Sequence, residues 1–475
     1  MIRRVALPVP LVLLLGCSGG DQTSAATATA TESDTAATGT AATDSTTGGE
    51  ATRPNWHQDV APLITRSCLG CHTSGGIAPF SMETYAEAAA WSPLIADDVE
   101  AGLMPPWHAL ETDVCQPALP YEHDPRLAAD EIQLLREWAD AGAPEGDPAL
   151  AAPLPDPQSL DLPNPTTTVK MGGTVTVEAA GNTLDYFHCL SLDPGHASDV
   201  FVDGLQLIPG NRAIVHHVLI YVDESAASAS WPNGIKTNCG GGTGVAAPTS
   251  LIAGWVPGGL PMTTPSDVGI ALPAGARLIL NVHYHATGGG PESDDGTAVA
   301  LRWSATPPDY VSIFKLLGEP AEATPLTGPL MIPANEKDHV EDYEWTVSYG
   351  GQPFPDSIEA RIWAVAHHMH KVGIDMRMWV IDRDTKEETC LLHTPRWDFD
   401  WQRVYEYDAP VGDAVRVKAG DTIRLRCVYD NSLDNPGVQQ VLAEVGLDAP
   451  VDVKAGEGTL DEMCIGAIGV AIRGL

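Results

Sequence analysis

The chain has 475 residues, of which 44% are hydrophobic, and its formal net charge is −37 at pH 7. This length predicts about two to four domains, and the hydrophobic content is sufficient for a sizeable core. The strong negative charge argues against general binding to nucleic acid or to anionic lipid.

The first residues have the pattern of an export signal. Two arginines precede an apolar run from Val5 to Leu15, which is too short to span a membrane as a helix. Because the run ends in Leu-Leu-Gly-Cys, it resembles a bacterial lipoprotein signal over residues 1–17, with Cys17 as the lipidated residue. We therefore expect an exported protein that is anchored in a bacterial cell envelope by lipid alone, where disulfides form. The alternative is an ordinary cleaved signal peptide with an incidental cysteine.

Residues 18–52 form a low-complexity segment. They are almost entirely Ser, Thr, Ala, Gly, Asp and Glu, and none is aromatic. Such a segment cannot bury enough apolar surface to offset the entropy lost on ordering, so we expect a disordered tether.

A haem-attachment signature follows at Cys68-Leu69-Gly70-Cys71-His72. In c-type haem proteins the two thiols bond the vinyl groups and the adjacent imidazole binds the iron. A diproline after Met104 could hold that methionine at the iron, and Asp130 to Asp140 has helical spacing.

The stretch from Trp56 to Gly146 resembles the cytochrome c-like modules of exported bacterial oxidoreductases. This resemblance implies a small all-α domain over residues 53–150 with one covalently bound haem c. It also implies His72 and Met104 as the two iron ligands. Met82 is the competing candidate, and we expect it to be a core residue instead.

From Asn164 onward the helical periodicity gives way to short alternating strands separated by Gly, Pro, Asn and Asp. This pattern predicts antiparallel β-sandwiches. The segment from Gly288 to Asp309 is rich in turn-forming residues and predicts a boundary. We therefore expect two β-domains, over residues 164–305 and 308–475.

Histidines are concentrated in three short windows. Residues 215–218, 282–285 and 366–370 hold seven of the fifteen histidines, and Met463 follows near the C-terminus. Imidazole suits copper, zinc, iron or nickel, whereas a thioether narrows the choice toward copper. This pattern predicts two copper ions, one at an all-His site and one at a His/Met site.

Strand geometry limits which histidines can share a metal, because side chains at i and i+2 lie on one face. His368 and His370 can therefore bind one metal, and the residues between and before them become structural. His283 and His285 also share a face, which leaves the choice between them open. His216 and His217 point to opposite faces, so both reach one metal only at a strand end or a bulge.

Residues from about 165 to 475 resemble the copper type II, ascorbate-dependent monooxygenases, the family of peptidylglycine α-hydroxylating monooxygenase and dopamine β-monooxygenase. The resemblance implies two jelly-roll β-domains that each carry one copper, with a solvent-filled cleft between the two coppers. Four motifs carry it in family order: His216-His217, Val282-His283-Tyr284, His368-Met369-His370-Lys371-Val372-Gly373 and Asp461-Glu462-Met463-Cys464.

The resemblance also implies residue roles. The electron-storing copper would be bound by His216, His217 and His283, which favours His283 over His285. The oxygen-activating, catalytic copper would be bound by His368, His370 and Met463. Arg426-Cys427-Val428 resembles a family motif whose cysteine pairs with the one after the ligand methionine, so a Cys427–Cys464 disulfide is implied. The pairing of the remaining four cysteines (Cys115, Cys189, Cys239 and Cys390) stays open.

The departures from the family concern the substrate. Ala366 stands where peptide-amidating members carry an arginine for the substrate carboxylate, and Ile465 and Ala467 replace their Asn and Tyr. No cysteine lies shortly after His283, so their other disulfides are not all supported. We expect a monooxygenase that hydroxylates an aliphatic C–H of a small organic substrate with O2.

Electrons would come from an ascorbate-like reductant or a redox protein and pass through the haem to the all-His copper. The main alternative is a non-catalytic copper-binding or copper/haem electron-transfer lipoprotein. A zinc hydrolase is a weaker alternative, because the sequence has no HExxH helix.

Overall fold

The computed structural model describes residues 53–157, 159, 161–180, 183–319, 323–458 and 460–473. The predicted signal peptide, Cys17 and the predicted tether lie outside the described residues. From Arg53 onward the chain forms one compact unit. No helix in the described ranges is long and apolar enough to cross a bilayer.

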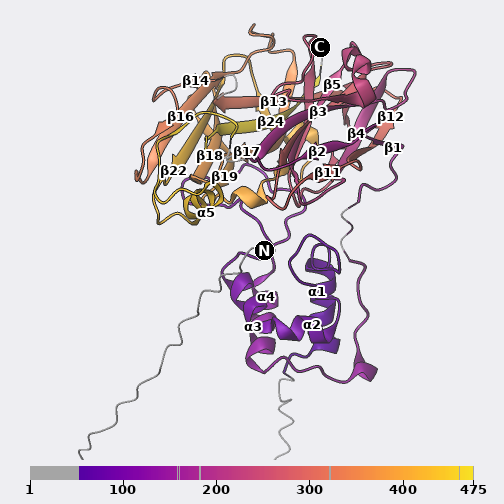
Figure 1. The fold of residues 1–475 in the computed structure, drawn as a ribbon, viewed down its shortest axis with the longest axis vertical. Coiled ribbons are helices and arrows are strands. Elements are labelled where there is room, and N and C mark those ends of the chain that lie inside the picture. Colours follow the sequence, from indigo (N-terminus) through magenta and orange to yellow (C-terminus); the bar gives the residue numbers. More distant parts are fainter. Residues whose placement is uncertain are drawn as a thin grey trace, which may run out of the picture. The chain divides into compact units, whose positions relative to one another are not determined.

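The helices of residues 56–140 gather into one group with its own core (Figure 1). Helix α2 begins with a capping box, in which the Thr84 hydroxyl and the Glu87 carboxylate each accept a backbone N–H of the other residue. Ile64, Leu135 and Trp138 are fully buried at the centre of the group. The helical spacing of Asp130 to Asp140 corresponds to α4. The helices are η1 (Trp56–Val60), α1 (Ala61–Ser67), α2 (Tyr85–Ala90), α3 (Ser92–Glu100) and α4 (Ala129–Asp140), followed by η2 (Pro148–Leu150).

The rest of the described chain is mainly β-sheet, as the strand pattern predicts. One five-stranded antiparallel sheet has β10 at its centre and carries two of the histidine windows. Its strands, in spatial order, are β6 (Ile235–Lys236), β3 (Asp185–Leu192), β10 (Arg277–His285), β5 (Val215–Asp223) and β7 (Ser250–Trp255).

A second five-stranded antiparallel sheet lies in the C-terminal half, and two small strand pairs accompany the larger sheets. Its strands are β14 (Thr324–Pro325), β16 (His339–Thr346), β22 (Thr422–Tyr429), β18 (Gly373–Ile381) and β19 (Glu388–Thr394). The small pairs are β2 (Val175–Val177) with β11 (Glu292–Asp294), and β15 (Met331–Ile332) with β23 (Val453–Lys454). Short helices between strands are η3 (Ala227–Ser230), η4 (Pro232–Gly234), η5 (Phe399–Trp401), η6 (Val411–Asp413) and α5 (Pro436–Val445).

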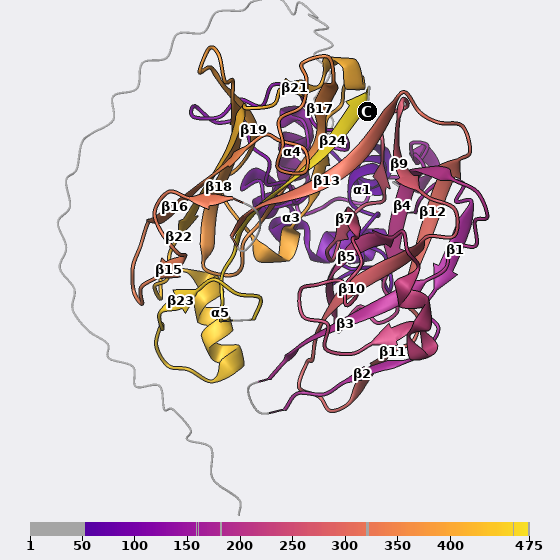
Figure 2. The same ribbon diagram turned by 90° about the horizontal axis from the view of Figure 1, so that it is seen from above.

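A ten-stranded sheet connects the two β-regions. In Figure 2, β24 runs between β13 and β17, and β9 lies beside β13 on the other side. The β9–β13 contact is the parallel junction of the sheet, where Tyr310 pairs with Val268. The strands are β1 (Thr167–Lys170), β12 (Ala298–Ser304), β4 (Val200–Ile208), β9 (Val268–Leu272), β13 (Tyr310–Glu319), β24 (Cys464–Arg473), β17 (Glu359–His368) and β20 (Val404–Glu406), with β8 (Met262–Thr263) on β4 and β21 (Val415–Val417) on β17.

This large sheet contributes to two hydrophobic cores. One core joins its β4 and β12 end to the first five-stranded sheet, through residues such as Leu205 and Leu280. The other joins its β13, β17 and β24 end to the second five-stranded sheet, through residues such as Ile362 and Leu425. The two sandwiches expected at residues 164–305 and 308–475 therefore share one continuous sheet layer.

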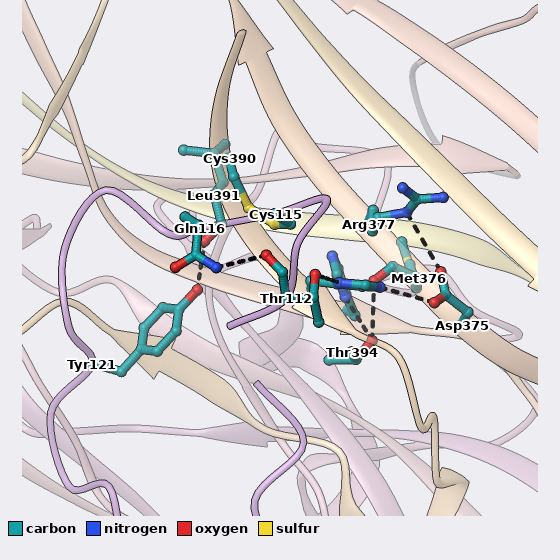
Figure 3. The surroundings of a disulfide bond; sticks show 12 residues. Thr112, Cys115, Gln116, Tyr121, Asp375, Met376, Arg377, Cys390, Leu391 and Thr394 are labelled. Carbon is teal, nitrogen blue, oxygen red and sulfur yellow. Dashed lines mark hydrogen bonds and ion pairs between the residues drawn. A yellow bond between two sulfur atoms is a disulfide. The ribbon is translucent and has the colours of Figure 1, made fainter. Parts of the chain in front are cut away.

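The segment that follows Met104 packs into the second core rather than into the helical group. Trp107 and Tyr121 are buried there, and the Tyr121 hydroxyl donates to Leu391 O over 2.6 Å. Close by, a disulfide links Cys115 to Cys390 of β19 (Figure 3). The helical group and the second sandwich are thus tied together by this segment.

Two further disulfides are present, Cys189–Cys239 and the Cys427–Cys464 pair that the family resemblance implied. Cys427 lies on β22 and Cys464 is the first residue of β24. The bond therefore joins the two sheets of the second sandwich directly beside Met463. Three disulfides are typical of a protein in an oxidising, exported compartment.

Candidate functional site

Three histidine rings converge where β5 and β10 pair, and we call His216, His217 and His283 the histidine group. The Nδ1 atom of His217 lies 3.3 Å from Nδ1 of His216 and 3.3 Å from Nδ1 of His283. All three ligand atoms lie within 4.8 Å of one another, which is the arrangement that one metal ion requires.

A β-bulge explains how two adjacent histidines reach one point. His283 pairs with His217, but the next residue, Tyr284, pairs with Val215, so His216 is the extra residue of β5. A bulge interrupts the alternation of side chains between the two faces. Burial lowers the pKa of His216 and His217 well below the usual range. Both rings are therefore neutral at physiological pH, which is the form that binds metals.

Asp185 distinguishes His283 from His285. Its Oδ1 atom accepts from Nε2 of His283 and from Nδ1 of His285, each over 2.9 Å. The bond at Nε2 turns Nδ1 of His283 toward the other two histidines, in the way that outer carboxylates orient metal ligands. The hydrogen bond to Asp185 raises the pKa of His285. Asp185, His283 and His285 also form an overlapping group that could hold a metal.

A second set of candidate ligands, His368, His370 and Met463, is called the His/Met group. The His368 and His370 rings have centroids 5.2 Å apart. Nδ1 of His368 lies 2.5 Å from Gln402 Oε1, and Nδ1 of His370 lies 2.9 Å from Asp461 O. These contacts occupy the Nδ1 atoms, which leaves the Nε2 atom of each ring as the candidate ligand atom. Met463 directly precedes β24 and lines the same cavity as both rings.

Burial also keeps the rings of the His/Met group neutral. It lowers the pKa of His368, and it lowers the pKa of His370 to about 3. The residues next to them have structural roles. His367 is buried and contacts Thr394 Oγ1 through its Nδ1 atom over 3.0 Å, and Met369 lies in the second core. A Cβ atom at Gly373 would lie 2.8 Å from the Met369 side chain, which is why glycine closes this motif.

Glu462 holds the two halves of the His/Met group together. Its fully buried carboxylate accepts the backbone N–H groups of His370 over 2.6 Å, Val372 over 3.0 Å and Met463 over 2.8 Å. Desolvation raises the pKa of this carboxyl to about 7. One side chain therefore sets the position of the histidine loop relative to the methionine.

The histidine group and the His/Met group lie next to each other. The ring centroids of His217 and His368 are 5.9 Å apart. Phe399 stacks on His216 with a centroid distance of 5.0 Å and lies 5.8 Å from His370. This arrangement differs from the solvent-filled cleft that the family resemblance implied, because aromatic rings occupy the space between the groups.

A cavity of about 380 Å³ opens beside His217, His368, His370 and Met463. Most of its lining side chains are apolar and come from both sandwiches. The polar ones include Gln402 and Glu406, and burial raises the pKa of Glu406 to about 8. Among the apolar lining residues are Phe187, Leu219, Trp255, Met262, Phe314, Ala366, Ile465 and Ala467.

The predicted haem ligands lie in the helical group. Cys68 and Cys71 are free and half-buried, and burial raises the pKa of Cys68 to about 12. The Nδ1 atom of His72 lies 3.0 Å from Phe80 O, which directs Nε2 away from the backbone. An imidazole anchored in this way fits a proximal iron ligand.

The two methionines near the signature differ in position. Met82 is buried in the helical core, and its backbone N–H donates to His72 O over 2.9 Å. Met104 is half-buried and packs on the edge of the same core, directly before the segment that enters the second sandwich. These positions fit the expectation of Met82 as a core residue.

Comparison with known proteins supports the resemblance to copper monooxygenases in the C-terminal part of the chain. Residues 326–441 match the family model described as copper type II ascorbate-dependent monooxygenase, C-terminal domain. The matched segment contains His368 and His370, but neither Met463 nor the histidine group. DBH-like monooxygenase protein 2 from Mus musculus is 25% identical over 270 residues, which are 54% of this chain and 38% of that protein. The chain thus matches well under half of this curated relative.

Two solved virus structures resemble the chain only weakly. The structure of infectious bursal disease virus Gx strain is 10% identical and covers 66% of this chain and 72% of that chain, with a TM-score of 0.16. The Gt strain structure has 9% identity, 68% and 74% coverage and a TM-score of 0.12. Scores this low carry no argument about fold or function.

Sequence reasoning missed three residues that orient the candidate ligands: Asp185, Gln402 and Glu462. Glu462 lies inside the Asp-Glu-Met-Cys motif, so its place beside Met463 was a usable signal. Asp185 and Gln402 are single polar residues, distant in sequence from the histidines that they contact. No spacing rule identifies them.

Proposed function

We propose that the chain is a copper-dependent monooxygenase that hydroxylates an aliphatic C–H bond of a small, apolar organic substrate with O2. The observation that carries this proposal is a largely apolar cavity that members of both candidate ligand groups border. The similarity of residues 326–441 to copper type II monooxygenases supports the same chemistry.

The donor sets fit two copper ions. Three converging imidazole nitrogens suit Cu(I) or Cu(II), and two imidazoles with a thioether favour Cu(I), the state that meets O2. When bound, the two coppers supply the one-electron steps and the O2 activation that monooxygenation requires. The protein contributes ligands that contacts with Asp185, Gln402 and Asp461 O pre-orient.

Other groups of the protein orient the candidate ligands and position the substrate. Asp185 orients His283, Gln402 orients His368, and Asp461 O orients His370. Glu462 sets the spacing between the two elements of the His/Met group. The apolar wall positions a C–H bond beside this group without a charged anchor at residues 366, 465 or 467.

The helical group supports a second part of the proposal, an electron-delivering c-type haem. Two free thiols at Cys68 and Cys71, and the anchored ring of His72, suit covalent haem attachment with Met104 as the second iron ligand. A His/Met-ligated haem has no open position for O2 and suits electron transfer. The haem would accept electrons from an ascorbate-like reductant or a redox protein.

We also propose that the mature protein is exported and attached to the bacterial cell envelope through lipid on Cys17. The three disulfides support export. Labelling of the protein with a radioactive or clickable fatty acid, lost in Cys17→Ser, tests the anchor.

Incubation with isotopically labelled O2 tests the proposed activity. The purified protein, a reductant and a panel of small apolar compounds should give products that contain one labelled oxygen, detected by mass spectrometry. Met463→Ala should abolish product formation while the histidine group keeps its copper. The control Met331→Ala changes an exposed methionine of β15 and should be fully active.

A non-catalytic copper/haem lipoprotein would behave differently. It would undergo reduction and reoxidation of its metals without incorporating label into any organic product. Equal turnover in Met463→Ala and in the unmodified protein would contradict the assignment of the oxygen-activating site.

A further inference from the structure

The second sandwich contains a cavity of its own, of about 250 Å³, between its two sheets. Its walls come from β13, β17 and β24 of the ten-stranded sheet and from β16 and β22 of the second five-stranded sheet. Residues 347–358, which join β16 to β17, cover one side of it. We call this space the second cavity, and the one beside His217 and His368 the main cavity.

The two cavities lie on opposite faces of the ten-stranded sheet. Along β13, Ile313 lines the second cavity and its neighbour Phe314 lines the main one. Along β24, Ile468 lines the second cavity and Ala467 lines the main one. Because successive side chains of a strand point to opposite faces, one sheet layer separates the two spaces. The second cavity is therefore distinct from the cavity that the candidate copper ligands border.

The lining of the second cavity is mainly apolar. Among the described lining residues Lys315 alone is charged. Protein interiors normally contain few voids larger than a water molecule, and a water molecule needs two to four polar partners to be held in one. The space instead leaves four large apolar side chains of the lining only partly buried, namely Ile313, Trp345, Phe354 and Ile358. A wall of this chemistry suits an uncharged, apolar occupant.

The covering segment is tied to the sandwich near both of its ends. At its start, the backbone N–H of Val347 donates to Asp421 O over 2.8 Å. Toward its other end, the Asp356 carboxylate accepts from the Arg383 guanidinium over 2.7 Å. These contacts hold the segment over the cavity and oppose its collapse onto the apolar floor. The open space is thus maintained by specific contacts of the chain.

A glycine turn lies in the middle of the covering segment. The backbone groups of Tyr349 and Gln352 pair over 2.8 and 3.0 Å and close the turn around Gly350 and Gly351. Both glycines have positive φ angles, of 58° and 75°, and no other group lies within 4 Å of the place where a Cβ atom of either would be. Tyr349 is 51% exposed. This sparsely packed turn is the part of the wall that opens most easily.

We propose that the second cavity binds a small, neutral, mainly aliphatic molecule. This site needs neither copper nor haem, and it goes beyond the proposed monooxygenase activity. An apolar molecule bound here loses its contact with water and gains packing contacts with side chains that border open space. An anion would meet one charged group, at Lys315, and would lose its hydration among aliphatic side chains, so a neutral molecule fits the lining better.

Nuclear magnetic resonance of isoleucine methyl groups distinguishes the two cavities. Among the described residues, the main cavity is lined by one isoleucine, Ile465, and the second cavity by Ile313, Ile358, Ile423, Ile468 and Ile472. The full, chemically reduced chain with labelled isoleucine methyls is titrated with cyclohexane as the neutral probe and with hexanoate as the anionic one. We expect cyclohexane to shift the methyl signals of the second cavity to saturation, and hexanoate to leave them unchanged.

Two variants fill the second cavity from different walls. Ile313→Phe adds volume from β13, and Ser348→Leu adds it from the covering segment. In each, the affinity for cyclohexane at the remaining isoleucines of the second cavity should fall by about tenfold or more, while any shift of Ile465 persists. The control Ile208→Phe makes the same change at the end of β4, lines neither cavity and should bind like the unmodified chain. Thermal unfolding checks that every variant is folded.

Three results overturn the proposal. If cyclohexane causes no saturable shift at the isoleucines of the second cavity, the cavity does not take such a molecule. If the shifts persist at the same affinity in a folded filling variant, the probe binds elsewhere. If hexanoate binds more tightly than cyclohexane, the site belongs to an anion held near Lys315. None of these results bears on the proposed copper chemistry, because the measurement requires no turnover.

Discussion

The imidazole rings of His217 and His368 lie with their centroids 5.9 Å apart, although they come from β5 and β17 of different sheets. The contact forms where the two sandwiches face each other, and Phe399 lies against His216 of one ligand group and His370 of the other. The two candidate ligand groups therefore approach each other directly through His217 and His368.

His283 and His285 should respond differently to the same substitution. His283→Ala removes one of three converging ligands, so the copper content should fall by one ion per chain. His285→Ala removes only a partner of Asp185, so both coppers should remain, with an affinity about 10–100-fold weaker at the histidine group. Metal analysis and competition with a Cu(I) chelator measure both effects. Loss of copper in His285→Ala alone would assign the ligand role to His285.

Substrate preference should follow the apolar lining of the cavity. Ala366, Ile465 and Ala467 face the cavity and supply no cationic anchor for the carboxylate of glycine-extended peptides at these three positions, so we expect such peptides to be poor substrates. Neutral compounds small enough for about 380 Å³ should give the higher kcat/KM. Product analysis by mass spectrometry compares the two classes, and efficient conversion of the peptides would show this inference to be wrong.

Glu406 should make the protein less stable as pH rises. Burial raises the pKa of its carboxyl from 4.5 to about 8, so the folded state binds this proton more tightly than the unfolded state. The contribution is fully present below pH 4.5 and is lost as pH rises through 8, a change on the order of a few kcal/mol.

Glu406→Gln removes this titration and should flatten the pH dependence of the free energy of unfolding over that range. Thermal or denaturant unfolding at several pH values measures it. Glu344→Gln, at a partly exposed ion pair with Arg424, is the matched control. An equally steep decline in Glu406→Gln would contradict the role of this carboxyl.

Electrons should reach copper through the haem. Covalent fusion keeps the donor at a high effective concentration beside its acceptor. Reduced haem should therefore be oxidised when the cupric protein is mixed in a single turnover, as stopped-flow absorbance would record. His72 or Met104 substitutions should slow turnover with a cytochrome-reactive donor and spare turnover with ascorbate. Absence of haem oxidation on the turnover timescale would reject the relay while leaving the monooxygenase assignment intact.

The three histidine windows predicted two metal sites, but not every structural feature that brings their histidines together. The rule of alternating faces correctly limited His216 and His217 to a strand end or a bulge, and the register shift at β5 is such a bulge. Periodicity could not locate that shift, because an extra residue leaves no compositional signal. Strand patterns likewise predicted sandwiches, whereas the parallel β9–β13 pairing that joins them depends on contacts distant in sequence.

Long-range contacts account for most of what was missed. Cys115 pairs with Cys390 across 275 residues. No sequence feature distinguished this pairing from the other possible pairings of the four remaining cysteines. Gln402 orients His368 from the connection between η5 and β20, and nothing in its neighbours distinguishes it from other polar residues. Such positioning residues become visible only when packing brings them to the ligands.

The metal content of the purified, exported protein tests the central claim most directly. The account predicts two copper ions per chain by inductively coupled plasma mass spectrometry, because both donor sets are complete. The count should fall to one in Met463→Ala. Stoichiometric zinc in place of copper, or no bound metal after growth in copper-supplemented medium, would contradict the account.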